Sequence, residues 1–99
     1  MAFKILIEPE VHQDIQSGID YYNERQPGLG RKFHAEVSAY FKKLKTHPFY
    51  QKRYNNVRCL PLQKFPYMVH FTVDEKQKIV IIRAVLSTYL DPAHWKDRS

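Results

Sequence analysis

The segment from about Lys78 to Leu86 constrains the fold most strongly, because it is apolar at nearly every position. Such a run is typical of an interior strand that is covered on at least one face. The extended segment before it, Tyr67–Val73, instead places every second residue from Tyr67 on one apolar face. The polar residues 74–77 between the two segments predict a hairpin connection. The second half of the chain therefore predicts a sheet that another layer must cover.

Two amphipathic helices are predicted in the first half of the chain. The first begins at Glu8-Pro9 and ends near Arg25, and its apolar face consists of Val11, Ile15, Ile19 and Tyr22. Pro27, Gly28 and Gly30 indicate a short turn after it. The second helix is expected from about Leu29 to Thr46, with an apolar stripe of Phe33, Val37, Tyr40, Phe41 and Leu44. His47-Pro48 then ends it.

The remaining segments complete the predicted topology. Phe3–Ile7 reads as a short first strand, Phe49–Asn56 as an irregular connection, and Val57–Leu62 as a further strand. The order is β-α-α-β-β-β, an α+β fold in which a helical hairpin packs on one face of a small, mainly antiparallel sheet. We expect the first strand to pair with the apolar strand of about residues 78–86. A length of 99 residues predicts a single domain, residues 1–99.

The positive charge of the chain is concentrated in its middle third. The net charge is +6, and no carboxylate occurs between Glu36 and Asp74. All the charged side chains of residues 41–70 are basic: Lys42, Lys43, Lys45, Lys52, Arg53, Arg58 and Lys64. Such a segment either attracts a polyanion, namely RNA, DNA or an acidic peptide, or is a solvated basic face without a partner. Three of the lysines also suit the C-terminal end of the second helix.

The cysteine and hydropathy patterns limit the compartment and the cofactors. Cys59 is the one cysteine, so an internal disulfide is impossible, and a cytoplasmic location is expected. The sequence contains no signal-peptide pattern and no membrane-spanning run, so no membrane association is predicted. The histidines lack short ligand spacings, so no metal and no other cofactor is expected.

Several pieces of the sequence, taken in order, resemble the RelE/ParE family of bacterial toxins, the toxic members of type II toxin–antitoxin pairs. They are Ile19-Asp20-Tyr21-Tyr22, Arg58, Leu60-Pro61-Leu62, Phe65-Pro66-Tyr67, and Asp91-Pro92 ahead of Trp95. The resemblance covers nearly the whole chain and implies the α+β fold predicted above. It also implies a toxin that arrests growth and is neutralised by a cognate antitoxin.

The resemblance leaves two activities open. RelE-like members cut mRNA on the ribosome without a metal, which requires proton transfer and stabilisation of a charged phosphorane. ParE-like members poison DNA gyrase and are not enzymes. For the first activity, the catalytic candidates are Arg58, Tyr89 and Lys52, and the candidates for binding nucleic acid or another target are Arg53, Lys64, His70 and His94. Each of these is alternatively a surface or packing residue, and Arg58 could share a groove with His70.

The segment before Asp91 departs from the family pattern. Many relatives carry a histidine and one or two arginines there, whereas this chain has Ser87, Tyr89 and Leu90 at those positions. The departure puts ribonuclease chemistry in doubt and leaves a non-toxic family member, or a small nucleic-acid-binding module, as a further alternative. Each toxin hypothesis shares one partner, an antitoxin with an acidic, partly disordered tail that orders as it binds the basic segment.

Overall fold

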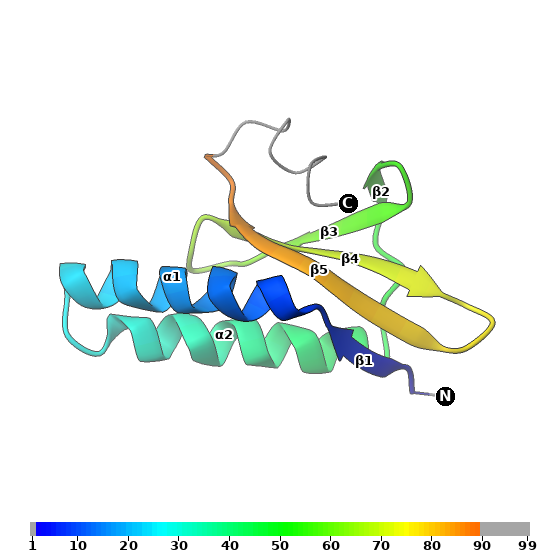
Figure 1. The fold of residues 1–99 in the computed structure, drawn as a ribbon, viewed down its shortest axis with the longest axis horizontal. Helices are drawn as coiled ribbons and strands as arrows, with labels where there is room; N and C mark the ends of the chain where they lie inside the picture. Colours follow the sequence, from blue (N-terminus) through cyan, green and yellow to red (C-terminus); the bar gives the residue numbers. More distant parts are fainter. Residues whose placement is uncertain (1, 90–99) are drawn as a thin grey trace.

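Residues 2–89 are described by the computed structural model, which places two helices and five strands among them (Figure 1). The elements are β1 (Lys4–Ile7), α1 (Pro9–Arg25), α2 (Leu29–Leu44), β2 (Lys52–Tyr54), β3 (Val57–Pro61), β4 (Tyr67–Asp74) and β5 (Ile79–Ser87). None of the helices in this range is long and apolar enough to cross a membrane.

The strands form one mixed sheet in the order β1-β5-β4-β3-β2. Strand β1 pairs in parallel with β5, and the other neighbours are antiparallel. The predicted fold class and the predicted pairing of the first strand with the apolar strand are therefore confirmed. The run of apolar residues in β5 is explained by its position between β1 and β4, away from either edge.

Strand β2 corrects the sequence prediction of an irregular connection over Phe49–Asn56. Lys52–Tyr54 pairs antiparallel with β3 across a tight turn at Asn55 and Asn56. Asn55 has a φ of 47°, in the left-handed region that asparagine tolerates better than most residues. The Asn-Asn pair was thus a hairpin signal, but a three-residue strand is too short to show the alternation that identifies strands.

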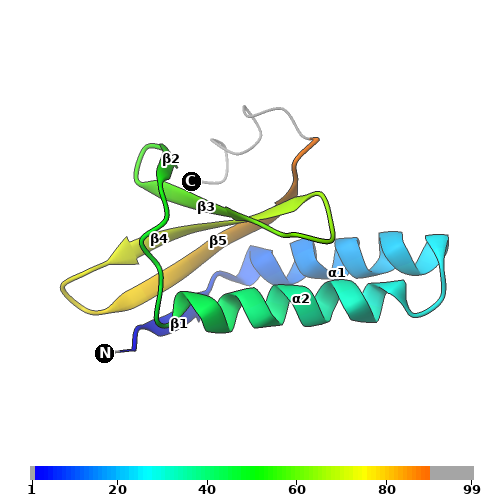
Figure 2. The same ribbon diagram turned by 180° about the vertical axis from the view of Figure 1, so that it is seen from behind.

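Both helices lie on the same face of the sheet, as Figures 1 and 2 show from opposite sides. The hydrophobic core lies between the layers, with Val11 from α1, Phe33 and Val37 from α2, and Phe71 and Ile82 from the sheet all at most 1% exposed. The predicted apolar faces of the helices are confirmed, because their remaining members pack against this core. Helix α2 ends at Leu44, two residues before the predicted end at Thr46.

The helices approach each other closely near their connection. The Gly30 N–H donates a hydrogen bond of 2.9 Å to the Asn23 side chain, which joins the start of α2 to the last turn of α1. A Cβ atom at Gly30 would lie 2.5 Å from the Ile19 carbonyl oxygen. Glycine is therefore required at this position by the distance between the two backbones.

Candidate functional site

Arg58 lies where the end of α2, the connection after it and the sheet meet. Its guanidinium donates a 2.7 Å hydrogen bond to the Tyr50 carbonyl and lies 5.4 Å from the centre of the Phe49 ring. The side chain is half-buried. Arg58 therefore holds the connection between α2 and β2 against the sheet. Lys52 lies opposite it in the strand register and is exposed, so these two predicted residues are neighbours.

Tyr89 lies far from this pair. Arg58 is opposite Phe71, which in turn is opposite Ile82 on β5. From Ile82 the rest of β5, to Ser87, extends about 17 Å further, and Tyr89 follows beyond it. There its side chain is 86% exposed, at the end of the sheet where the Thr88 N–H donates to the Pro66 carbonyl. The three predicted catalytic residues are thus not brought together.

His70 points to the face of the sheet opposite Arg58, because it lies opposite Cys59, one residue further along β3. The expectation of a groove shared by His70 and Arg58 is therefore wrong. His70 is also fully buried, not half-exposed as a strand histidine often is. Its Nδ1 lies 3.0 Å from the Tyr54 hydroxyl and 3.4 Å from the Cys59 sulfur. Tyr54 comes from the strand that sequence reasoning missed, so this cluster could not be found in advance.

The Cys59 thiol is buried beside His70. Burial raises the pKa of the Cys59 thiol to about 11, and the charge of Arg53 opposes this rise only in part. Arg53 itself is exposed on β2. A thiol with so high a pKa is protonated at neutral pH and is a poor nucleophile.

Arg83 is a charged site that the sequence analysis missed. It is the extra residue of a β-bulge between β4 and β5, and its guanidinium forms a 2.9 Å salt bridge with Glu8 and a 3.2 Å hydrogen bond to Thr72. These contacts tie β4 and β5 to the start of α1. The sequence did offer a signal for this site, because Arg83 is the single charged residue in the apolar run of residues 79–86.

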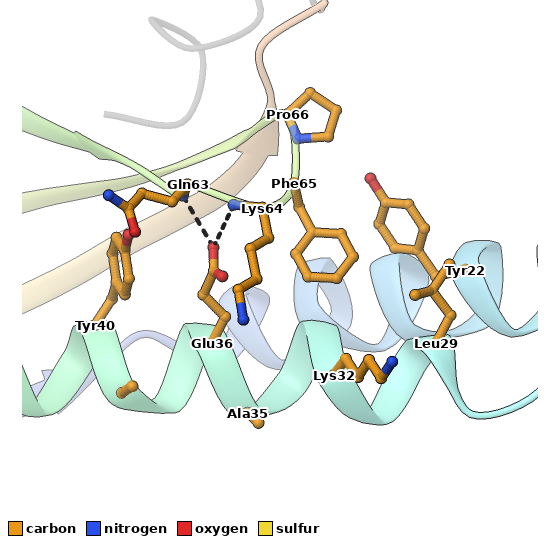
Figure 3. A pocket seen from close by; sticks show the side chains of 11 residues that line it. Tyr22, Leu29, Lys32, Ala35, Glu36, Tyr40, Gln63, Lys64, Phe65 and Pro66 are labelled. Carbon is orange, nitrogen blue, oxygen red and sulfur yellow. Dashed lines mark hydrogen bonds between the residues drawn. The ribbon is translucent and has the colours of Figure 1, made fainter.

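Lys64 belongs to another part of the molecule. It lies in the connection between β3 and β4, whose backbone is held to α2 by the Glu36 carboxylate. This carboxylate accepts the N–H groups of Gln63 and Lys64 at 3.0 and 3.1 Å. The Lys64 side chain extends from the connection toward α2 (Figure 3). Arg58 and its partner Lys52 lie at the start of β3, whereas Lys64 follows the end of that strand, so the three residues do not form one site.

A groove of about 860 Å³ runs between the outer side of α2 and this connection. Its walls are mostly apolar and are formed by Tyr22, Leu29, Ala35, Ala39, Tyr40, Phe65 and Pro66, with Lys32, Glu36, Gln63 and Lys64 along it (Figure 3). Two of the lining rings are in contact with each other, because the Tyr22 and Phe65 ring centres are 4.8 Å apart. Burial raises the pKa of the Tyr22 phenol. We refer to this feature as the α2 groove.

Two further predictions from the sequence concern the C-terminal residues after position 89 and the binding of a metal. His94 and the Asp91-Pro92 pair lie outside the described residues. Within residues 2–89, no group of three or more His, Cys, Asp or Glu side chains is arranged to hold a metal ion.

A family model described as the ParE toxin of type II toxin–antitoxin systems, parDE, matches residues 5–89. The chain therefore belongs to the ParE toxin family. No curated protein matches the chain in sequence.

Solved structures share its fold at low sequence identity. A chain in the structure of the chromosomal ParDE toxin–antitoxin system of P. aeruginosa is 18% identical in sequence to this chain and superposes with a TM-score of 0.75. The match covers 87% of this chain and 96% of that one. A mutant of the E. coli toxin RelE in the free state is 11% identical, with a TM-score of 0.72 over 96% and 93%. The RelBE2 toxin–antitoxin complex of Mycobacterium tuberculosis is 14% identical, with a TM-score of 0.60 over 88% and 99%.

Proposed function

We propose that this ParE-family toxin arrests growth by binding DNA gyrase and does not cleave RNA. The observation that carries the proposal is the separation of the candidate catalytic residues. Arg58 is engaged by Tyr50 and Phe49, and Tyr89 lies beyond the far end of β5. RNA cleavage requires the groups that transfer protons and stabilise charge to surround one phosphate, within hydrogen-bond reach of it. A toxin that acts by binding needs only a surface.

A cognate antitoxin is the second part of the proposal. Two of the similar solved structures are described as toxin–antitoxin systems or complexes. The α2 groove is suited to a segment with apolar side chains, because most of its walls are apolar and it stays open along α2. Lys32 and Lys64 along the groove favour acidic residues in that segment. Antitoxin titrations with variants altered in the groove test this assignment.

Inducible expression in a bacterium without the antitoxin tests the proposed activity. RNA 5′ ends and DNA covalently linked to gyrase are mapped minutes after induction. We expect growth arrest, intact messages and accumulation of gyrase-linked DNA. Tyr89→Phe and Lys52→Gln should arrest growth as the wild type does, because neither residue has a chemical role in this proposal.

The proposal fails if new cuts appear within translated messages, and loss of those cuts in Tyr89→Phe or Lys52→Gln would assign the cleavage to these residues. It also fails if the soluble, folded protein causes no arrest, which would favour a non-toxic member of the family. Circular dichroism of the purified variants shows whether each is folded.

A further inference from the structure

A second exposed surface, separate from the α2 groove, lies where α2 ends beside β1. Figure 2 shows the chain leaving α2 next to β1 and rising across the sheet to β2. Two aromatic rings, Phe3 and Phe49, lie there with four basic residues that contact them or adjoin them: Lys45, Lys52, Arg58 and Lys78. We refer to these six residues as the Phe49 patch.

The patch is held together by ring contacts that alternate with cations. The Phe3 and Phe49 rings meet edge to face with their centres 5.7 Å apart. The Lys78 ammonium lies 5.3 Å from the centre of the Phe3 ring, and the Arg58 guanidinium lies 5.4 Å from that of Phe49. The Phe3 N–H donates to the Lys45 carbonyl at 2.7 Å, which fixes the end of α2 to the same place.

The two rings have different environments. Phe3 is only 7% exposed and belongs to the core, whereas Phe49 is 56% exposed. A single exposed phenylalanine is ordinary. Phe49 differs because its ring is held between a buried ring and a guanidinium, so that its position is fixed while more than half of the residue remains open to solvent.

The cations of the patch are not neutralised within the described part of the chain. Lys45, Lys52 and Lys78 are exposed, and none of the four cations forms an ion pair with a carboxylate among residues 2–89. Asp74 lies in the nearby β4–β5 hairpin, where its carboxylate accepts the Gln77 N–H. The patch therefore presents positive charge around an ordered, accessible ring.

We propose that the Phe49 patch binds a single-stranded nucleic acid, with an unpaired base stacked on Phe49 and phosphates contacted by Lys45, Lys52 and Lys78. Aromatic rings among basic side chains bind unpaired bases in this way, because every base has a flat face and every nucleotide carries a phosphate. A duplex would offer its phosphates but not its base faces. An acidic peptide would use the cations and would not require the exposed ring. The inference goes beyond the proposed function, since it depends on neither gyrase nor the antitoxin.

Fluorescence anisotropy with labelled oligouridine and oligothymidine of about 12 nucleotides tests the proposal on the purified full chain. We expect both strands to bind, more weakly as salt rises from about 50 to about 200 mM. Phe49→Ala should weaken binding about tenfold, and Phe49→Tyr should retain it, since tyrosine keeps the stacking ring. Lys52→Gln should lower the slope of log affinity against log salt by about 0.7.

Tyr21 provides a matched control. It is 45% exposed and has the Arg25 guanidinium 4.7 Å from its ring centre, but it lies near the end of α1 that is farthest from the patch. Tyr21→Ala should leave the affinity unchanged. Thermal unfolding followed by circular dichroism establishes that each variant is folded.

The arms of the experiment separate the alternatives. Binding of oligouridine alone identifies RNA, binding of oligothymidine alone identifies DNA, and either result supports the proposal. No binding by the wild type, unchanged binding by folded Phe49→Ala, or an equal loss in Tyr21→Ala overturns it. Competition by a duplex at equal strength also overturns it. Displacement of the strand by oligoglutamate, with direct oligoglutamate binding that Phe49→Ala leaves unchanged, would assign the patch to an acidic peptide instead.

Discussion

Arg58 shows how the surroundings of a single residue decide its role. In the sequence it is a strand arginine within a basic segment, where a phosphate would be a natural partner. In the folded chain its guanidinium donates to the Tyr50 carbonyl and stacks on Phe49. A side chain engaged in this way stabilises the fold at the point where α2 leads into the sheet. This is why Arg58 supports the position of Phe49 in the patch and is not assigned as a phosphate ligand there.

Cys59 carries a prediction at the same scale. Burial raises the pKa of its thiol from 9.0 to about 11, because the thiolate would lose its hydration. The folded state therefore favours the protonated thiol. The contribution of Cys59 to the free energy of unfolding is full below about pH 9 and is lost as the pH rises through about 11. We expect the stability difference between the wild type and Cys59→Ala, measured by urea unfolding, to shrink over that range.

Thiol reactivity checks the same prediction independently. Because the chain has one cysteine, reaction with a disulfide reagent reports on Cys59 alone. At pH 8 the native protein should react far more slowly than the protein unfolded in urea. Equal rates in the two states would contradict the predicted protection.

At the scale of the elements, the helical hairpin was predictable, whereas the edge strand β2 was not. Pro9, Pro27 and Pro48 mark the limits of the helices, and their apolar faces repeat with helical spacing, so local sequence determines both helices. Strand β2 depends on pairing with β3 and has only three residues. Its existence therefore rests on a tertiary contact that no periodicity records.

The close approach of the helices leads to a prediction for Gly30→Ala. Alanine normally stabilises a helix interior by up to about 1 kcal/mol relative to glycine. Here its Cβ would lie 2.5 Å from the Ile19 carbonyl oxygen, which belongs to the backbone and cannot rotate away. We expect the variant to lose about 1–3 kcal/mol of unfolding free energy in urea denaturation. His34→Ala, at an exposed position of the same helix, should change it by no more than about 0.5 kcal/mol. A Gly30→Ala variant more stable than the wild type would show that the helices can separate without cost.

At the scale of the whole molecule, the fold keeps two candidate interaction surfaces apart. The α2 groove faces the connection between β3 and β4, and the Phe49 patch lies at the end of α2 beside β1. Ala39, on the groove, is about 9 Å along the helix from Lys45, at the start of the patch. Substitutions in separate surfaces usually have independent effects at such distances.

We therefore predict that the two surfaces can be disabled separately. Ala39→Arg should weaken binding of the cognate antitoxin about tenfold or more in calorimetric titrations, because it places a large charged side chain on the apolar wall of the groove. It should leave oligonucleotide affinity unchanged. His34→Arg adds the same charge to α2 outside the groove and serves as the control for net charge. Loss of antitoxin affinity in both variants would show that the groove is not the contact.

The sequence by itself determined the fold class, both helices, four of the five strands, the pairing of the first strand with β5, and the concentration of positive charge in the middle third. Local periodicity, turn residues and composition express these features directly. The tertiary structure alone decided which side chains lie together. It placed His70 and Arg58 on opposite faces of the sheet, moved Tyr89 away from Arg58, and brought Phe3 against Phe49. The physical reason is that a site depends on strand register and on contacts between segments distant along the chain, where a shift of one residue reverses the face to which a side chain points.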